Sequence, residues 1–328
     1  MNDPKLQVST IPVVRFSLDR SVATAFGCII LMLLGGALYS REFLSPEYLL
    51  QQLQISAFLG IIASGAMMVI LIGHIDLSIP WTVTLGAMMA TAVAGWYGDA
   101  GAVFAIPAGV LCGALVGLLN GLGVAYLRLP SMIFTLGMNA VVQGLMVLHT
   151  GGFAPQDHAT DAMHFLAVGR PIFGFPNALF IWILIGAFTT FLLTRTVFGR
   201  RVYAVGNRET AAYLSGINTN AVIIWCFILS GAAAAFAGVL LAGYSTKAYQ
   251  AMGDPYLLPA IAAVVLGGTN ILGGRGNYLG TIAGVILITL LQSILAVMQM
   301  PEAGRQIIYG VVILAMLLSY GRSEIDRK

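Results

Sequence analysis

The chain has 328 residues, of which 59% are hydrophobic and only 9% carry a charge, and its mean hydropathy is +0.90. Because soluble domains carry roughly 25% charged residues, this composition excludes a soluble protein and indicates an integral membrane protein. The net charge of +3 does not indicate a nucleic-acid partner, because the basic residues lie at the ends of apolar stretches.

Ten apolar stretches approach the length of about 20 residues that a membrane-spanning helix needs. They cover residues 22–40, 53–72, 79–97, 102–127, 130–150, 177–195, 219–243, 256–272, 277–299 and 305–320. The third and eighth are the weakest, because Pro80 opens one and Gly267 and Gly268 interrupt the other. The sequence therefore predicts an all-α, polytopic membrane protein with about ten spans in a single domain over residues 1–328. The polar residues 1–21 precede a first span that we expect to remain uncleaved.

Basic residues indicate the orientation of these spans. With the N-terminus in the cytoplasm, most lysines and arginines fall on the inner side, and the outer segments hold only Arg41, Arg170, Lys247 and Arg305. The positive-inside rule therefore predicts that both termini are cytoplasmic.

One acidic side chain, Asp76, has apolar stretches on both sides. A carboxylate near the hydrocarbon is costly and normally faces a cavity, a partner or the interface. It is therefore a candidate pathway or gate residue. Alternatively, Asp76 or Ser78 caps the next helix, which has Pro80 in its first turn.

Small residues recur at helical spacing inside the predicted spans. Gly109, Gly113, Gly117 and Gly121 follow one another at every fourth position, and Gly231 and Gly238 flank a run of alanines. Small residues at this spacing allow helices to approach closely in lipid.

The fifth predicted span carries Thr135, Asn139 and Gln143, which are spaced four apart and share one helix face. Such groups can hydrogen-bond sugar hydroxyls in a wet passage, or they can hydrogen-bond neighbouring helices. Asn120 and Gln292 are further pathway candidates.

No metal site is predicted. The cysteines are Cys28, Cys112 and Cys226, and the histidines are His74, His149, His158 and His164. The cysteines lie inside apolar stretches without ligand spacing, and no two histidines have the spacing of a ligand pair on a helix.

Residues 196–218 form the longest polar interruption in the second half of the chain. Asn207 is a suitable N-cap, Glu209 falls in the first turn that follows, and Gly216 is placed to end the helix. Such a two-turn helix is too short to be stable alone. The segment is either a loop whose arginines fix topology, or a helix that docks on a soluble partner through the small face of Ala211, Leu214 and Ser215.

The glycine-rich segment 260–280 lacks the G-x-x-x-x-G-K-[ST] motif and opens no βαβ unit, so it predicts no nucleotide site. Broken helices with glycine are instead tolerated at membrane depth when they are buried in protein or line a cavity.

Three segments in matching order resemble sugar ABC importer permeases of the ribose/xylose/arabinose type. The cytoplasmic coupling segment of that family is matched by Gly199-Arg200, Tyr203-Ala204-Val205-Gly206, Ala211-Ala212 and Ser215-Gly216-Ile217. The family's Gly-Ile-Asp-Leu-Ser motif is similar to residues 73–78, with His74 in place of its glycine. Its glycine-rich pattern matches residues 260–269 and 273–276, with Pro259 at the position of an aspartate.

The resemblance implies a permease subunit of an ATP-driven bacterial monosaccharide importer in the inner membrane, for a pentose, deoxyhexose or hexose. It implies that two permease subunits, identical or different, form the pathway, and that a periplasmic sugar-binding protein delivers the sugar. A cytoplasmic ABC ATPase would hold ATP and Mg and dock on residues 196–218, while this chain binds no cofactor and is not an enzyme. The coupling residues implied are Gly199, Arg200, Asn207, Glu209, Ala211, Ala212, Leu214 and Gly216.

The alternative is an ion-coupled secondary transporter or channel for a small polar solute. Such proteins usually keep ionisable groups at depth for coupling, and the sequence offers only Asp76 and His74 for this role.

Overall fold

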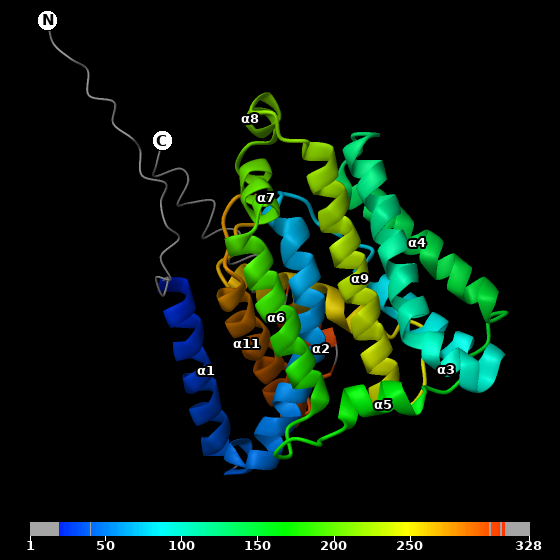
Figure 1. The fold of residues 1–328 in the computed structure, drawn as a ribbon. Coiled ribbons are helices and arrows are strands. Elements are labelled where there is room, and N and C mark those ends of the chain that lie inside the picture. Colours follow the sequence, from blue (N-terminus) through cyan, green and yellow to red (C-terminus); the bar gives the residue numbers. More distant parts are fainter. Residues whose placement is uncertain (1–19, 40, 302, 309, 312–328) are drawn as a thin grey trace, which may run out of the picture.

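The computed structural model describes residues 20–39, 41–301, 303–308, 310 and 311, and the elements of this part are helices joined by loops (Figure 1). The only strand-like pairings in these residues are the isolated bridges His158–Lys247 and Ile172–Phe175. The all-α prediction is therefore confirmed. The α-helices are α1 (Arg20–Tyr39), α2 (Pro46–Leu71), α3 (Ile79–Ala125), α4 (Ser131–His149), α5 (Asp161–Val168), α6 (Asn177–Arg195), α7 (Val197–Asn207), α8 (Glu209–Leu214), α9 (Thr219–Ser245), α10 (Leu257–Leu266) and α11 (Tyr278–Val297). Two short 3₁₀ turns, η1 (Arg41–Leu44) and η2 (Asp254–Tyr256), precede α2 and α10.

Six helices in the described residues are long and apolar enough to cross a membrane, so the predicted count of ten is not confirmed. They are Pro46–Leu71, Ala100–Ala125, Ser131–His149, Asn177–Arg195, Thr219–Ser245 and Tyr278–Val297. The element α3 covers the predicted spans 79–97 and 102–127 as two helical segments, which are separated by non-helical backbone at Gly98 (φ 55°, ψ −131°). The predicted span 256–272 contains only the short helix α10, because the chain turns at Gly268 (φ 88°). The predicted span 305–320 lies mostly outside the described residues.

The core is organised around α2. Every side chain from Ser56 to Leu71 is buried, and α2 packs against α6, α9, α10 and α11. A helix that is apolar on all faces belongs in the centre of a bundle. α2 therefore forms the interior of the molecule, with much of α3, α4 and α6 exposed on the outside.

The contact between α3 and α9 depends on the small residues seen in the sequence. A Cβ atom added at Gly117 would overlap the carbonyl oxygen of Phe227, and one added at Gly231 would overlap that of Gly113. These glycines allow the two backbones to approach directly. The prediction of close helix packing at these glycines is confirmed.

Gly117→Leu should therefore remove most of the folded protein. The obstacle is the backbone of α9, which cannot move aside, so we expect a cost of about 3 kcal/mol or more, at the upper end for overpacking. The measurement is the monodisperse fraction in size-exclusion chromatography after detergent extraction. Gly137→Leu is the matched control, because Gly137 is exposed on α4 and nothing lies within 4 Å of an added Cβ. Equal yields for the two variants would contradict the close contact.

The helix ends gather into two groups at opposite ends of the molecule (Figure 1). α7, α8 and the start of α9 lie at one end, together with the end of α2 and the 267–277 connection. α5 and the end of α9 lie at the other, where Ala159 N donates to Thr246 O at 2.9 Å. Arg128, the arginines of α7 and Arg275 belong to the first end, and Lys247 belongs to the second. The charge pattern placed these residues in the same two groups, and the predicted orientation of the termini is not confirmed.

Candidate functional site

The short helix α8 projects from one end of the molecule and presents an open surface (Figure 1). Ala211 and Ser215 are exposed, and Leu214 is 79% exposed, whereas Ala212 is buried against the protein. Gly216 (φ 81°) ends the helix: its N–H donates to Tyr213 O at 2.9 Å, and Ile217 N donates to Ala212 O at 3.1 Å. These two bonds form a Schellman motif. The sequence thus predicted both the helix and the residue that terminates it.

The start of α8 differs from the prediction. Asn207 is not the N-cap of α8 but the last residue of α7, and the extended residue Arg208 precedes α8 without a side-chain cap. The helix α7 was not predicted. It begins at Thr196, whose hydroxyl accepts a hydrogen bond from Gly199 N at 3.2 Å, and it buries Val202 and Val205. Packing of this apolar face extends the helix to Asn207, so the residue cannot take the cap conformation.

The predicted coupling residues on α7 differ in their exposure. Gly199 is buried, and a Cβ at this position would overlap the carbonyl oxygen of Leu193. Arg200 and Asn207 are exposed. The absence of a side chain at Gly199 therefore allows α7 to pack closely against α6. The side chain of Arg200 is exposed at the surface.

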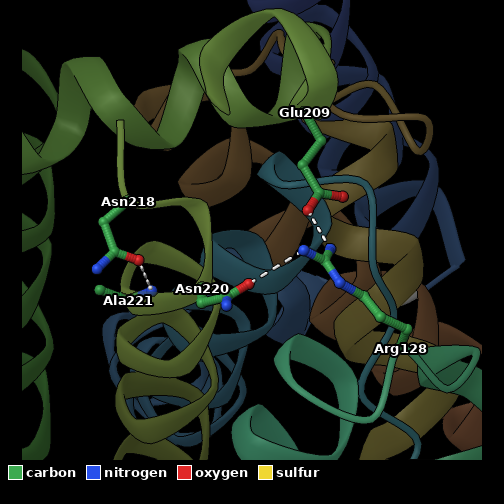
Figure 2. A network of polar contacts seen from close by, with 5 residues as sticks. All are labelled: Arg128, Glu209, Asn218, Asn220 and Ala221. Carbon is green, nitrogen blue, oxygen red and sulfur yellow. Dashed lines mark hydrogen bonds and ion pairs between the residues drawn. The ribbon is translucent and has the colours of Figure 1, made fainter. Parts of the chain in front are cut away.

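Arg128 joins α8 to two other elements (Figure 2). This residue lies in the connection between α3 and α4 with φ 53°, and its guanidinium pairs with the carboxylate of Glu209. It also donates to Asn220 Oδ1 on α9 at 3.3 Å. The side chains of Arg128 and Glu209 are 57% and 37% exposed. A solvated pair of this kind contributes little to stability, so its importance is to position α8.

The polar face of α4 binds the backbone of the α2–α3 connection and the first turn of α3. Thr135 Oγ1 accepts a hydrogen bond from Leu77 N at 2.9 Å, and Asn139 Oδ1 accepts one from Trp81 N at 3.2 Å. Ser131 Oγ accepts a longer one from Ile75 N at 3.4 Å. Trp81 N is one of the amides that a helix N-terminus leaves unsatisfied, and α4 supplies an acceptor for it and for two amides of the connection before α3. Gln143 lies on the exposed surface of α4.

Asp76 lies inside the protein, where three hydrogen bonds hold its carboxylate. Oδ1 accepts from Ser78 N at 3.0 Å and from Ser78 Oγ at 2.6 Å, and Oδ2 accepts from Ser230 Oγ on α9 at 2.9 Å. Asn120 of α3 donates to Ser78 Oγ at 2.8 Å, while its own Oδ1 has no partner. The cluster of Asp76, Ser78, Asn120 and Ser230 therefore ties the α2–α3 connection to both α3 and α9.

The sequence did not identify Ser78 as a partner of Asn120, nor Ser230 as a partner of Asp76. The spacing of Asp76 and Ser78 is that of an Asx turn, which could have been recognised. Ser230 is 154 positions from Asp76 in the chain, and no local pattern marks it.

Comparison with known proteins agrees with this organisation. Residues 48–317 match the family model described as branched-chain amino acid transport system / permease component. The chain belongs to this family. With six apolar spans in its described residues, it is a multi-pass inner-membrane transport subunit and not an enzyme.

Individual relatives of this permease match over most of its length. The autoinducer 2 import system permease protein LsrC of Escherichia coli O9:H4 (strain HS) is 32% identical over 308 residues, which are 93% of this chain and 87% of the relative. The ribose import permease protein RbsC of Escherichia coli (strain K12) is 33% identical over 282 residues, 85% of this chain and 87% of the relative. RbsC of Haemophilus influenzae (strain ATCC 51907 / DSM 11121 / KW20 / Rd) is 31% identical over 318 residues, 96% of this chain and 97% of the relative.

The three segments that carry the sequence resemblance meet at the α8 end of the permease. Gly274 N donates to Leu71 O at 2.9 Å, and a Cβ at Gly206 would overlap that same carbonyl. Tyr203 OH donates to Gly276 O at 2.9 Å. The end of α2, the end of α7 and the glycine-rich connection are therefore in direct backbone contact next to α8.

His74 lies close to this junction. Its ring packs near Phe227, with centroids 6.2 Å apart. Burial lowers the pKa of His74; the charge of Glu209 opposes this shift, and the charge of Arg128 adds to it. The ring is therefore neutral at neutral pH.

One pathway candidate is separate from the others. Gln292 is half-buried on α11, which packs against α1, α2 and α10, whereas Asp76, Asn120, Thr135 and Asn139 lie together around the start of α3. In the described residues, no three His, Cys, Asp or Glu side chains are grouped as metal ligands.

Proposed function

We propose that this permease is the membrane-spanning subunit of an ATP-driven monosaccharide importer. The observation that carries the proposal is the exposed helix α8, which lies on the basic end of a permease whose relatives include ribose import proteins. The sugar would be a pentose, a deoxyhexose or a hexose, and two permease subunits would form the pathway.

Three partners complete the proposed importer. A cytoplasmic ABC ATPase holds ATP and Mg and docks on Ala211, Leu214 and Ser215, which face away from the protein. A second permease subunit, identical or different, pairs in the membrane. A periplasmic binding protein delivers the sugar at the end opposite α8. Both termini are then cytoplasmic, as the charge pattern predicts.

In the proposed mechanism, a chain of polar contacts carries movement of α8 into the membrane. Movement of Glu209 is transmitted through its ion pair to Arg128, which lies just before α4. The hydroxyl of Thr135 and the amide of Asn139 on α4 hold the backbone of residues 77 and 81. Asp76 then links this region to α9 through Ser230. A shift of α8 would thus reposition the start of α3, and alternating access follows if that region lines the passage.

This arrangement assigns different roles to the polar candidates. Asp76 and Asn120 are buried and hold the α2–α3 connection, so we propose that they shape the passage rather than contact sugar. Asn139 is partly exposed and Gln143 is exposed, so these two residues of α4 are the ones placed to meet a passing hydroxyl. Gln292 lies on α11, which packs against α1, α2 and α10, and is therefore apart from this set.

The ion pair allows a direct test of coupling. Arg128→Glu places two carboxylates together and should lower ATP-driven uptake by roughly fivefold or more, at the lower end of ordinary coupling energies. Glu209→Arg should do the same, and the double variant should recover most of the lost uptake because the pair is restored with opposite polarity. Folded yield should stay constant, since the pair is solvated.

The measurement is the uptake rate in proteoliposomes at equal amounts of assembled importer. Arg195→Glu is the control, because Arg195 is also an exposed arginine but lies outside residues 196–218 and has no part in the Arg128 network. If the double variant is as slow as the worse single variant, the pair does not transmit the movement.

A further inference from the structure

A pocket of about 500 Å³ opens between α3, the end of α4 and the connection that follows α4. Its lining includes Thr91 and Trp96 of α3, His149 of α4, and Gln156 and Asp157 of the connection. The connection leads into α5, which lies at the end of the permease opposite α8 (Figure 1). The volume is in the range of small-molecule sites, which usually measure about 300–1,000 Å³.

Specific contacts hold the walls of this pocket. The chain reverses direction after α4 at Gly151 (φ 61°) and Gly152 (φ 82°). Gln250, in the segment between α9 and η2, holds this turn by donating to Thr150 Oγ1 at 3.0 Å and to Phe153 O at 3.1 Å. Hydrogen bonds from another part of the fold therefore hold the connection that forms this pocket.

The Asp157 carboxylate lies against the α3 backbone at Gly95. A Cβ added at Gly95 would overlap this carboxylate, so α3 and the connection are in direct contact there. The rings of Trp96 and His149 meet edge to face, with centroids 5.6 Å apart. These two contacts fix α3 relative to the end of α4 and to the connection that follows it.

The side chains suit a neutral polyol. Trp96 is 57% exposed, and its flat indole offers a surface for the apolar face of a sugar ring. Gln156, His149 and Asp157 offer both donors and acceptors for hydroxyl groups. Within the described residues, the lining includes a carboxylate but no lysine or arginine. A ligand with its own carboxylate, such as an amino acid, would therefore find no opposite charge.

The position of the pocket connects it to the proposed passage. His149 lies at the far end of α4, and Asn139 and Thr135 lie on the same helix toward the α8 end. The pocket thus opens at one end of α4, while the other end of α4 binds the start of α3 and adjoins Arg128.

We propose that this pocket is an outer subsite in which a neutral monosaccharide rests after it leaves the periplasmic partner. The inference rests on the proposed function. Trp96 supplies the stacking surface, and Asp157 and Gln156 supply the hydrogen bonds.

The test is protection of a cysteine at the pocket. Gln156→Cys permease in nanodiscs is labelled with a polar maleimide in the presence of D-ribose, D-xylose, L-arabinose or D-glucose, with the wild-type chain giving the background of its own cysteines. At least one sugar should slow labelling by about twofold at a concentration equal to its dissociation constant. Trp96→Ala in the same background should abolish the protection, and Trp96→Phe should keep part of it. Phe173→Cys is the control, because Phe173 is 95% exposed on the segment between α5 and α6.

Protection by no sugar, or equal protection by leucine, overturns the subsite. So does protection that persists in Trp96→Ala. ATP-driven uptake without protection removes the subsite and leaves the importer in place. Protection without ATP-driven uptake keeps a sugar site and removes the proposed function.

Discussion

Ala211→Trp should abolish both the binding of the ATPase subunit and the uptake of sugar, while the permease still inserts and folds. The side chains of Ala211 and Ser215 on the exposed face of α8 are small. An indole in place of the Ala211 methyl group would prevent the ATPase subunit from packing closely against this face. Loss of a hot spot worth about 2 kcal/mol raises the dissociation constant of an interface roughly thirtyfold. The permease fold should tolerate the change, since the buried residue of this helix is its neighbour Ala212.

Co-purification of the ATPase subunit with tagged permease is the measurement, together with uptake in proteoliposomes. Phe173→Trp is the matched control, because it introduces the same side chain at an exposed site far from α8. Glu209→Lys should also weaken binding, by breaking the ion pair with Arg128 that positions α8. Full co-purification of Ala211→Trp permease would show that the ATPase binds elsewhere.

Asp76→Leu should leave little folded permease. The change removes the acceptor of three hydrogen bonds and leaves Ser78 N–H and two hydroxyl groups buried without it. Each unsatisfied buried group costs about 1–3 kcal/mol, so the loss should exceed about 3 kcal/mol. Asp76→Asn keeps one acceptor oxygen for Ser78 and should retain most of the fold, with a lower Tm.

This pair of variants separates a structural role for Asp76 from a direct role in transport. If the carboxylate only holds the α2–α3 connection, uptake per folded Asp76→Asn molecule should stay within about twofold of wild type, a difference of only about 0.4 kcal/mol. Ser230→Ala is the control that removes a single hydrogen bond to the same carboxylate. A fully stable Asp76→Asn permease without uptake would instead make Asp76 a charge of the pathway itself.

Local chemistry explains which parts of the fold could be predicted from the sequence. The lengths of the apolar stretches predicted most of the long helices. The spacing of the glycines predicted that helices pack closely at Gly117 and Gly231, although not that α3 and α9 are the two partners. Gly216 was correctly identified as the end of α8, because a left-handed residue after a helix needs only local geometry.

Features that depend on distant residues could not be predicted in this way. The helix α7 forms because Val202 and Val205 are buried by packing with other elements, and this packing moved the start of α8 past Asn207. The spacing of Thr135 and Asn139 indicated a polar face, but not that its partners would be backbone amides of residues 77 and 81. Length alone also did not reveal that α10 ends before Gly268, where the chain turns.

The most direct measurement for the central claim is sugar uptake by purified permease in liposomes, with and without its ATPase subunit and binding protein. We expect uptake only when both partners are present and ATP is supplied on the side of α8, and no uptake from a proton or sodium gradient alone. Uptake by the permease alone, driven by an ion gradient and indifferent to ATP, would contradict the claim and identify an ion-coupled transporter.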